Sequence, residues 1–246
     1  MDKKNNKPVG ELIYGIHPLI EVLKAKRRKV ISIYTTKPEP KAWQQHIAPL
    51  IAEKRIPIQY VQRPILDRMA GTTDHQSIVA WVQPFVFRSK PFDTQKHPFL
   101  LMLDGIQDTK NLGAILRSAY CTGVSGIILT KKFSAPINAA TLKASAGLAE
   151  HLEIHIAQTP LTAAQDLTKQ GYHLYLAAFN GQDATTVNYT KPLVIVIGSE
   201  GEGISQGMQK FGTVVTLPQR TPDISYNASV AAGILLFIIS QNIKLS

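Results

Sequence analysis

Three stretches of the chain combine glycine with polar side chains at spacings that suit a ligand site. They read LDGIQDTKNLGAILRS (residues 103–118), VIVIGSEGEGIS (194–205) and VVTLPQRTPDISYNASVAAG (214–233). Carboxylate, amide, hydroxyl and guanidinium groups can together hold a polar substrate and manage a proton. Glycine, which has no Cβ, lets the backbone approach a ligand closely. What this chemistry is depends on the elements that position these groups.

Each stretch begins in an apolar run that predicts a buried strand. The runs are at 99–103, 126–129, 153–157, 172–178, 193–197 and 213–217, with helices between them and a last helix over about 227–242. Near-continuous apolar strands favour a parallel sheet covered on both faces. Ligands of such sheets gather beyond the carboxyl ends of the strands, where all three stretches lie. Simpler roles remain open, with Asn111 and either Ser225 or Asn227 as helix caps and the glycines as turns.

Arg117 stands out on the helix that we expect Asn111 to open. Leu112, Ile115 and Leu116 have the spacing of a face turned to a core, and Arg117 lies one step of about 100° past Leu116. An isolated arginine at that edge usually extends past the core into solvent. From its position alone this solvent-facing role is the default for Arg117, and a role in a ligand site at the strand ends is the alternative.

Residues 12–83 predict a separate small α/β domain. Strands are expected at 30–34, 58–61 and 78–82, and helices near 17–26, 42–54 and 65–69. The segment PFVFRSKPFDTQKHP, residues 84–98, contains three prolines and little periodicity, which is typical of a linker. We therefore expect domains at 1–83 and 99–246, joined by residues 84–98.

Positive charge is concentrated in the first part of the chain. The net charge is +10; residues 1–98 hold 17 Lys and Arg against 8 Asp and Glu, whereas residues 99–246 hold 10 against 9. Such asymmetry favours nucleic acid as the partner of the first part, with an anionic membrane a distant second. The densest run, KAKRRK at 24–29, also fits a solvated helix end.

Composition argues against several other classes of protein. No apolar run reaches the length of a membrane span, and residues 1–10 lack the apolar core of a secretory signal. The single cysteine, Cys121, suits a reducing cytoplasm, and we expect it to be a small buried core residue. HLEIH at 151–155 offers three ligands with no fourth nearby, so no metal site is expected. The spacing G-x-x-G-x-G at 198–203 is not that of a dinucleotide-binding loop.

Together the three stretches resemble the SpoU (TrmH-like) branch of the SPOUT RNA methyltransferases. The first family motif, Asn-x-Gly-x-x-x-Arg, matches Asn111, Gly113 and Arg117; the second, Gly-x-Glu-x-x-Gly, matches Gly198, Glu200 and Gly203; the third, Ser-x-Asn-x-Ser, matches Ser225, Asn227 and Ser229. YGIHPLIEVL (14–23) and DHQSIVAWV (74–82) are similar to the L30e-like substrate domain of bacterial 23S rRNA guanosine-2′-O-methyltransferases.

The resemblance implies an L30e-like N-terminal domain and a trefoil-knotted SPOUT domain with a mainly parallel sheet. It implies a cytoplasmic homodimer that uses S-adenosyl-L-methionine to methylate a ribose 2′-hydroxyl, in a guanosine of 23S-type rRNA. The alternatives are tRNA as the substrate of the same reaction, and a protein that binds RNA without catalysis. The implied catalytic residues are Asn111, Arg117, Glu200, Ser225 and Asn227, and the implied cofactor contacts are Gly198, Leu217 and Tyr226.

The chain departs from the family pattern at a few positions. It has Asp108-Thr109-Lys110 where Asp-Pro is frequent, Leu217-Pro218-Gln219 where Ile-Pro-Met is frequent, and Tyr226 where leucine is frequent. None of these changes removes a polar position of the three motifs. They bear on the identity of the target nucleotide rather than on the reaction.

Overall fold

The computed structural model describes residues 10–221 and 225–243 and divides the chain into two compact units. Unit 1 holds the residues up to Val86 together with Ile137–His151, and unit 2 holds Phe87–Pro136 and the residues from Leu152 onward. The second segment of unit 1 differs from the predicted boundaries, which assign residues 137–151 to the C-terminal domain.

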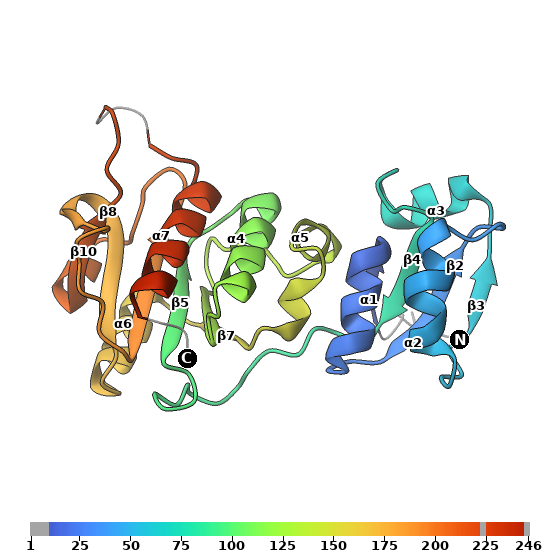
Figure 1. Ribbon diagram of the computed structural model, residues 1–246, viewed down its shortest axis with the longest axis horizontal. Coiled ribbons are helices and arrows are strands. Elements are labelled where there is room, and N and C mark those ends of the chain that lie inside the picture. Colours follow the sequence, from blue (N-terminus) through green and yellow to red (C-terminus); the bar gives the residue numbers. More distant parts are fainter. Residues whose placement is uncertain (1–9, 222–224, 244–246) are drawn as a thin grey trace, which may run out of the picture. The chain divides into compact units, whose positions relative to one another are not determined.

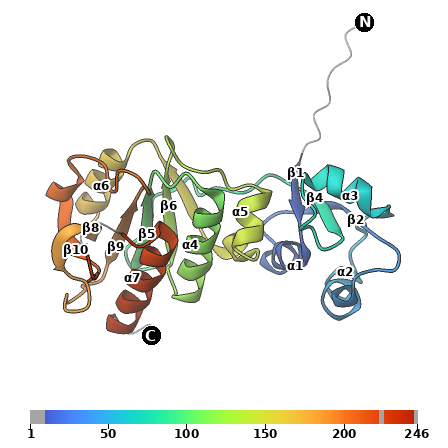
Figure 2. The ribbon, with the colours of Figure 1, turned by 90° about the horizontal axis from the view of Figure 1, so that it is seen from above.

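Unit 1 is built on a four-stranded sheet in the order β1-β4-β2-β3. Figure 2 shows α3 on one face of this sheet and α1 and α2 on the other. The strands are β1 (Glu11–Tyr14), β2 (Val30–Thr35), β3 (Ile58–Tyr60) and β4 (Ile78–Val82), and the helices are α1 (Ile16–Ala25), η1 (Trp43–Ile47), α2 (Ala48–Ile51), α3 (Arg63–Ala70), α5 (Ala139–Ala144) and η2 (Leu148–His151).

Two features of unit 1 differ from the sequence prediction. Strand β1 was not predicted, because its four residues lie between Gly10 and Gly15 and are too few to show a period. The helix expected over 42–54 divides into a π-helical turn, η1, and the single turn of α2. Pro49 sits in the first turn of α2 and has no N–H to bond back into the preceding turn, which accounts for the irregular start.

The basic run at 24–29 is not uniformly available to a partner. Arg28 is only 6% exposed, and its guanidinium binds the carboxylate of Glu150 and, at 2.8 Å, that of Glu11. Burial raises the pKa of the Glu150 carboxyl, and the hydrogen bonds and charge of Arg28 oppose that rise. Arg28 therefore ties residues 137–151 into unit 1 instead of contributing to its positive surface.

Unit 2 is a six-stranded parallel sheet in the order β10-β8-β9-β5-β6-β7. Helices α4 and α7 pack together on one face, and α6 lies on the other (Figures 1 and 2). The elements are β5 (Phe99–Asp104), α4 (Thr109–Cys121), β6 (Gly126–Thr130), β7 (Ile154–Ala157), α6 (Pro160–Lys169), β8 (His173–Asp183), β9 (Leu193–Gly198), η3 (Met208–Phe211), β10 (Gly212–Thr216) and α7 (Ala228–Asn242).

The core of unit 2 explains why these runs form strands. Every residue of β5, β6 and β9 is buried, as expected for central strands with helices on both faces. The predicted α/β class with a mainly parallel sheet is thus confirmed. Among the described residues, no helix is long and apolar enough to cross a bilayer.

Cys121 is exposed, so the expectation of a buried core residue is wrong. The core face of α4 is filled by Leu112, Ile115, Leu116 and Ala119. Position 121 lies about 200° around the helix from Ala119, because each residue turns the helix by about 100°. Its side chain therefore faces away from that core.

A buried histidine fixes the turn that leads into β4. His75 is 0% exposed, its Nε2 lies 2.7 Å from Asp67 Oδ1, and its Nδ1 accepts the N–H of Ser77 at 3.0 Å. Because Nδ1 is the acceptor, the ring proton belongs on Nε2, which donates to Asp67. The next two residues, Gln76 and Ser77, have positive φ angles, so this contact holds a conformation that the backbone alone disfavours.

Replacing His75 with alanine should destabilise unit 1. The change leaves the Ser77 N–H without its acceptor in a partly buried turn and removes the partner of Asp67, at a cost of about 1–3 kcal/mol in the free energy of unfolding. Both tryptophans of the chain, Trp43 and Trp81, lie in unit 1, so denaturant unfolding followed by tryptophan fluorescence reports on this unit. His46→Ala, at an exposed histidine of the same unit, is the control. Equal stability of the two variants would contradict the assigned role of His75.

Candidate active site

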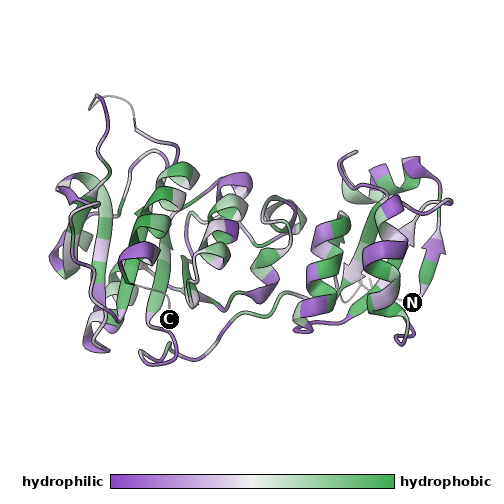
Figure 3. Ribbon diagram, viewed as in Figure 1, coloured by the Kyte–Doolittle hydropathy of each residue, from purple (hydrophilic) through white to green (hydrophobic). Residues whose placement is uncertain are grey.

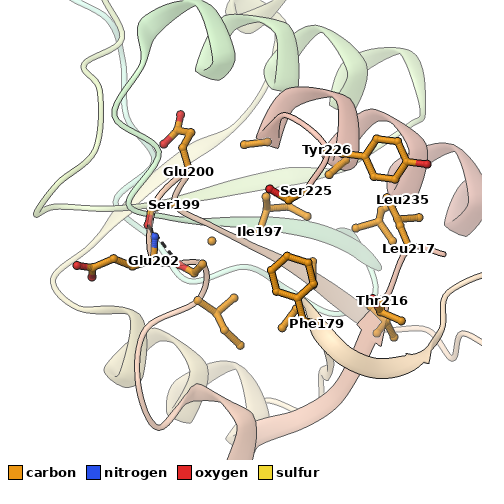
Figure 4. Close-up of a pocket in the computed structure, with 18 of the residues that line it drawn as sticks. Phe179, Ile197, Ser199, Glu200, Glu202, Thr216, Leu217, Ser225, Tyr226 and Leu235 are labelled. Carbon is orange, nitrogen blue, oxygen red and sulfur yellow. Dashed lines mark hydrogen bonds between the residues drawn. The ribbon is translucent and has the colours of Figure 1, made fainter. Parts of the chain in front are cut away.

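A pocket of about 620 Å³ opens in unit 2, at the carboxyl ends of β8, β9 and β10 and the start of α7. Its volume lies in the range that holds small organic ligands. Figure 4 shows Glu200 and Glu202 on one side, Tyr226 and Leu217 on the other, and Phe179 between them. Six of the eight predicted catalytic and cofactor-contact residues line it: Gly198, Glu200, Leu217, Ser225, Tyr226 and Asn227.

The glycine-rich loop after β9 is held in a compact turn. Ser199 and Gly203 exchange backbone hydrogen bonds of 2.9 and 3.1 Å, and Gly203 has a φ of +70°. A Cβ at Gly198 would lie 2.0 Å from the carbonyl carbon of Gly203, so only glycine fits there. Glycine is thus required at position 198 because the backbone of Gly203 packs closely against it, and this packing shapes the floor of the pocket.

The sequence suggested Asn111 as the N-cap of its helix, but the structure shows that it is not. Asp108 caps α4 instead, because its Oδ1 accepts the N–H groups of Lys110 and Asn111 at 2.7 and 2.8 Å. The Asn111 side chain is thereby left to donate from Nδ2 to Glu200 Oε1 at 2.9 Å. The cap correction therefore strengthens the site interpretation, since it joins the first motif to the second.

The third stretch, residues 214–233, forms the remaining wall of the pocket. Asn227 caps α7 through its Oδ1, which accepts the N–H and hydroxyl of Ser229 at 2.9 and 2.6 Å. Ser225 and Tyr226 precede it and are exposed toward the pocket. The Tyr226 hydroxyl donates to the Pro218 carbonyl at 3.4 Å, which links the two ends of this loop.

Arg117 does not join these residues within one chain. It is exposed on α4 and is not among the residues that line the pocket. Arg117 is six positions after Asn111, which places it about 9 Å further along the helix axis and about 120° away around that axis. The structure therefore brings together seven of the eight predicted site residues, with Asn111 joined through Glu200, and leaves Arg117 on the surface nearby.

Phe179 and Asn180 are among the pocket residues that the sequence analysis did not single out. Strand β8 continues to Asp183, beyond the predicted end at 178, and the register of β10 against it shifts between Val214 and Val215. Phe179 is 56% exposed in the pocket, and Asn180 has a φ of +60°. The Asn180-Gly181 pair is a known signal for an irregular backbone and could have marked this position.

The pocket suits a ligand that is partly apolar and partly cationic. Ala177, Ile197, Val215 and Leu235 form apolar walls, and the carboxylates of Glu200 and Glu202 supply negative charge. Thr216, Leu217 and Gln219 line the same space. An aromatic base attached to a positively charged group fits this combination of walls.

The HLEIH segment has structural contacts instead of a metal site. His151 Nε2 lies 2.7 Å from Glu21 Oε2 in unit 1, and His155 Nδ1 lies 3.0 Å from the Arg88 carbonyl in unit 2. No group of three metal-binding side chains occurs over 10–221 and 225–243.

Comparison with known proteins identifies the family. The SpoU rRNA Methylase family matches residues 98–237, and a domain described as RNA 2′-O ribose methyltransferase substrate binding matches residues 12–87. The 23S rRNA (guanosine-2′-O-)-methyltransferase RlmB of Pasteurella multocida is 33% identical, over 94% of this chain and 98% of its own. An uncharacterized tRNA/rRNA methyltransferase of Mycobacterium avium is also 33% identical, over 94% of this chain and 77% of its own.

Solved structures share the fold. The AdoMet-bound rRNA methyltransferase of Sinorhizobium meliloti superposes with a TM-score of 0.79 at 22% identity, covering 97% of this chain and 89% of that one. AviRb of Streptomyces viridochromogenes, in complex with AdoMet, gives 0.80 at 19% identity, covering 99% and 94%. The partly apolar, acidic pocket fits this cofactor, an adenine base joined to a sulfonium. The chain belongs to the SpoU family of RNA methyltransferases, which use S-adenosylmethionine.

Proposed function

We propose that this protein transfers a methyl group to the ribose 2′-hydroxyl of a guanosine in 23S-type rRNA. The observation that carries the proposal is the Asn111–Glu200 hydrogen bond of 2.9 Å, which joins two sequence motifs at the mouth of the pocket. The matches to RlmB proteins support the substrate, because they extend over both the substrate-binding and the catalytic parts of the chain. A tRNA substrate is the alternative, as in the name of the Mycobacterium avium relative.

The residues of the site divide between holding the cofactor and holding the ribose. S-adenosylmethionine supplies a methyl group that its sulfonium has already activated, so no covalent intermediate on the protein is required. Gly198, Leu217 and Tyr226 lie where they can hold it against the pocket walls. Glu200 and Asn111 offer an acceptor and a donor to a ribose at the pocket mouth, and Ser225 and Asn227 line the same pocket. Their task is alignment, which can supply much of the rate enhancement.

Arg117 is assigned to the RNA phosphate and to negative charge that develops on the 2′-oxygen. A guanidinium resists deprotonation, so it serves better as a donor than as a general base. Its exposure on α4 leaves it accessible to RNA or to the site of a second copy of the chain. A homodimer is therefore part of the proposed function.

The C-terminal helix α7 supports the dimer. It is apolar nearly all round, as its green colour in Figure 3 shows, and helices of that kind are normally buried on every side. In a single chain, however, Val230 is 48% and Phe237 60% exposed. A Cβ at Gly233, on the same stripe, would lie 3.6 Å from Ser118 of α4, so the uncovered stripe runs beside the helix that carries Arg117. A second copy packed on this face would cover the stripe and bring two Arg117 side chains to the interface.

Deleting the gene should remove one 2′-O-methylguanosine from 23S rRNA. The expected site is found by mapping 2′-O-methylation in both rRNA and tRNA of the deletion strain. Expression of the wild-type chain should restore the methyl group, and Glu200→Gln, which weakens the acceptor, should not. A methyl group missing from tRNA alone would reject the rRNA assignment and keep the reaction. Unchanged methylation throughout would favour RNA binding without catalysis.

Arg117→Lys should fold and bind the cofactor normally but lose most activity. Lysine keeps the charge and the helix propensity, yet lacks the planar fork that can grip two oxygens at once. Loss of a donor aimed at developing charge typically lowers the rate by ~10²–10³. Single-turnover methyl transfer at saturating RNA and cofactor, with thermal unfolding in parallel, measures the effect. Turnover within about twofold of wild type would make Arg117 an ordinary surface residue.

Phe237→Glu should convert the protein to monomers. A carboxylate in the middle of an apolar interface cannot be desolvated without a partner, so association should weaken strongly. Light scattering at micromolar concentration gives the mass. Leu161→Glu adds the same charge to exposed α6, on the opposite face of the sheet, and should leave the dimer intact. A wild-type protein that is already monomeric would refute the dimer outright.

A further inference from the structure

Phe133 is an aromatic side chain displayed to solvent in a strained backbone. It is 76% exposed, and its φ is +58°, in the left-handed region. That conformation costs an ordinary residue roughly 1–2 kcal/mol, and glycine would avoid the cost. Exposure of so large an apolar surface together with backbone strain indicates selection for something other than stability.

Hydrogen bonds on both sides of Phe133 hold its loop in place, and the side chain is exposed to solvent. Thr130, at the end of β6, donates from its hydroxyl to the Lys132 carbonyl at 3.3 Å and lies 3.1 Å from the Ser134 hydroxyl. The Ala135 N–H donates to the Ile106 carbonyl at 2.7 Å. The turn is therefore pinned on both sides of Phe133, so its position relative to the sheet is defined.

This loop is the immediate neighbour of the active-site loops. A Cβ on Gly105 would lie 3.5 Å from the Cβ of Ser199 and 3.9 Å from that of Phe133, so Gly105 sits between the two. Ser199 directly precedes Glu200, whose carboxylate also lies 3.5 Å from the N–H of Gln107. Phe133 thus lies in the loop after β6. This strand is next to β5, whose loop leads to Asn111, and both loops leave the same carboxyl edge of the sheet.

The surroundings of Phe133 are positively charged. Lys131 and Lys132 precede it directly, and both are exposed. An exposed ring next to two lysines, beside the proposed ribose site, matches the way proteins hold single-stranded RNA. There, bases stack on aromatic faces while lysines contact the phosphates.

We propose that Phe133 stacks on an unpaired RNA base next to the methylated nucleotide and so positions the target ribose at Glu200 and Asn111. Lys131 and Lys132 contact the adjoining phosphates. The inference rests on the proposed function, since it names how the RNA is held at that site. Phe133 is a positioning residue and takes no part in the chemistry.

The test uses the full-length protein and 23S rRNA purified from the gene-deletion strain. Phe133→Ala should lower kcat/KM for RNA about 5- to 150-fold, the range that corresponds to about 1–3 kcal/mol per stacked base. Phe133→Tyr, which keeps an aromatic face, should retain activity, whereas Phe133→Leu should behave like the alanine variant. The KM for S-adenosylmethionine should not change in any of them. Leu161→Ala, at an exposed apolar residue on α6, is the control.

Phe133→Gly separates the positioning role from a structural one. Glycine relieves the left-handed strain, so its melting temperature should equal or exceed that of the wild type while kcat/KM for RNA falls as in Phe133→Ala. A Phe133 that merely supported the fold would give the reverse, a lower melting temperature and a raised KM for the cofactor.

Two further outcomes would overturn the inference, and one would overturn only the proposed function. Wild-type kinetics in Phe133→Ala exclude the stacking role, and loss of the dimer in that variant, seen by light scattering, shows a protein contact instead. If the wild-type chain methylates no RNA, the proposed function fails. Equilibrium binding of the same rRNA then decides about Phe133: weaker binding by Phe133→Ala supports stacking, and equal binding rejects it.

Discussion

The proposed active site depends on a buried carboxylate at the end of a central strand. Asp104 closes β5, is 5% exposed, and accepts the N–H and the hydroxyl of Ser205 at 2.7 and 3.0 Å. It also pairs in register with Gly198, where the glycine-rich loop begins. Both ends of that loop are thereby tied to one strand. This tie acts together with the Ser199–Gly203 backbone bonds and the Asn111–Glu200 bond to fix the loop that carries Glu200.

From this fixed point the site extends along three adjacent strands. The loop after β9 carries the carboxylate, the loop after β5 leads to Asn111, and the loop after β6 carries the exposed aromatic ring. The proposed cofactor pocket lies on the β8 and β10 side of the same edge. A parallel sheet allows this division of labour because all its strands end on one side, so a ligand and a large substrate can meet there from different directions.

The sequence predicted the parallel strands well, because buried central strands read as unbroken apolar runs. It also located most pocket residues, since glycine and polar groups follow those runs directly. The prediction from sequence was wrong where two neighbouring residues could fill the same structural role. Asp108 and Asn111 are both good helix caps, and only the geometry shows that Asp108 takes the role. The extension of β8 to Phe179 and Asn180 depends on a register shift in its pairing with β10. Because β10 is distant in the sequence, the residues of β8 themselves carry no pattern that predicts this extension.

The bond between Asp104 and Ser205 also sets an order of events during synthesis. The two residues are 101 positions apart, and β5 pairs with β9, which is nearly as distant. A ribosome that adds about 5–20 residues per second needs roughly 5–20 s to cover that interval. Throughout this time Asp104 and the β9 edge of β5 lack their partners, although β6, the other neighbour of β5, has already been made. The proposed cofactor pocket therefore cannot form until β9, β10 and the start of α7 have been made, and a product truncated before β9 would lack it altogether.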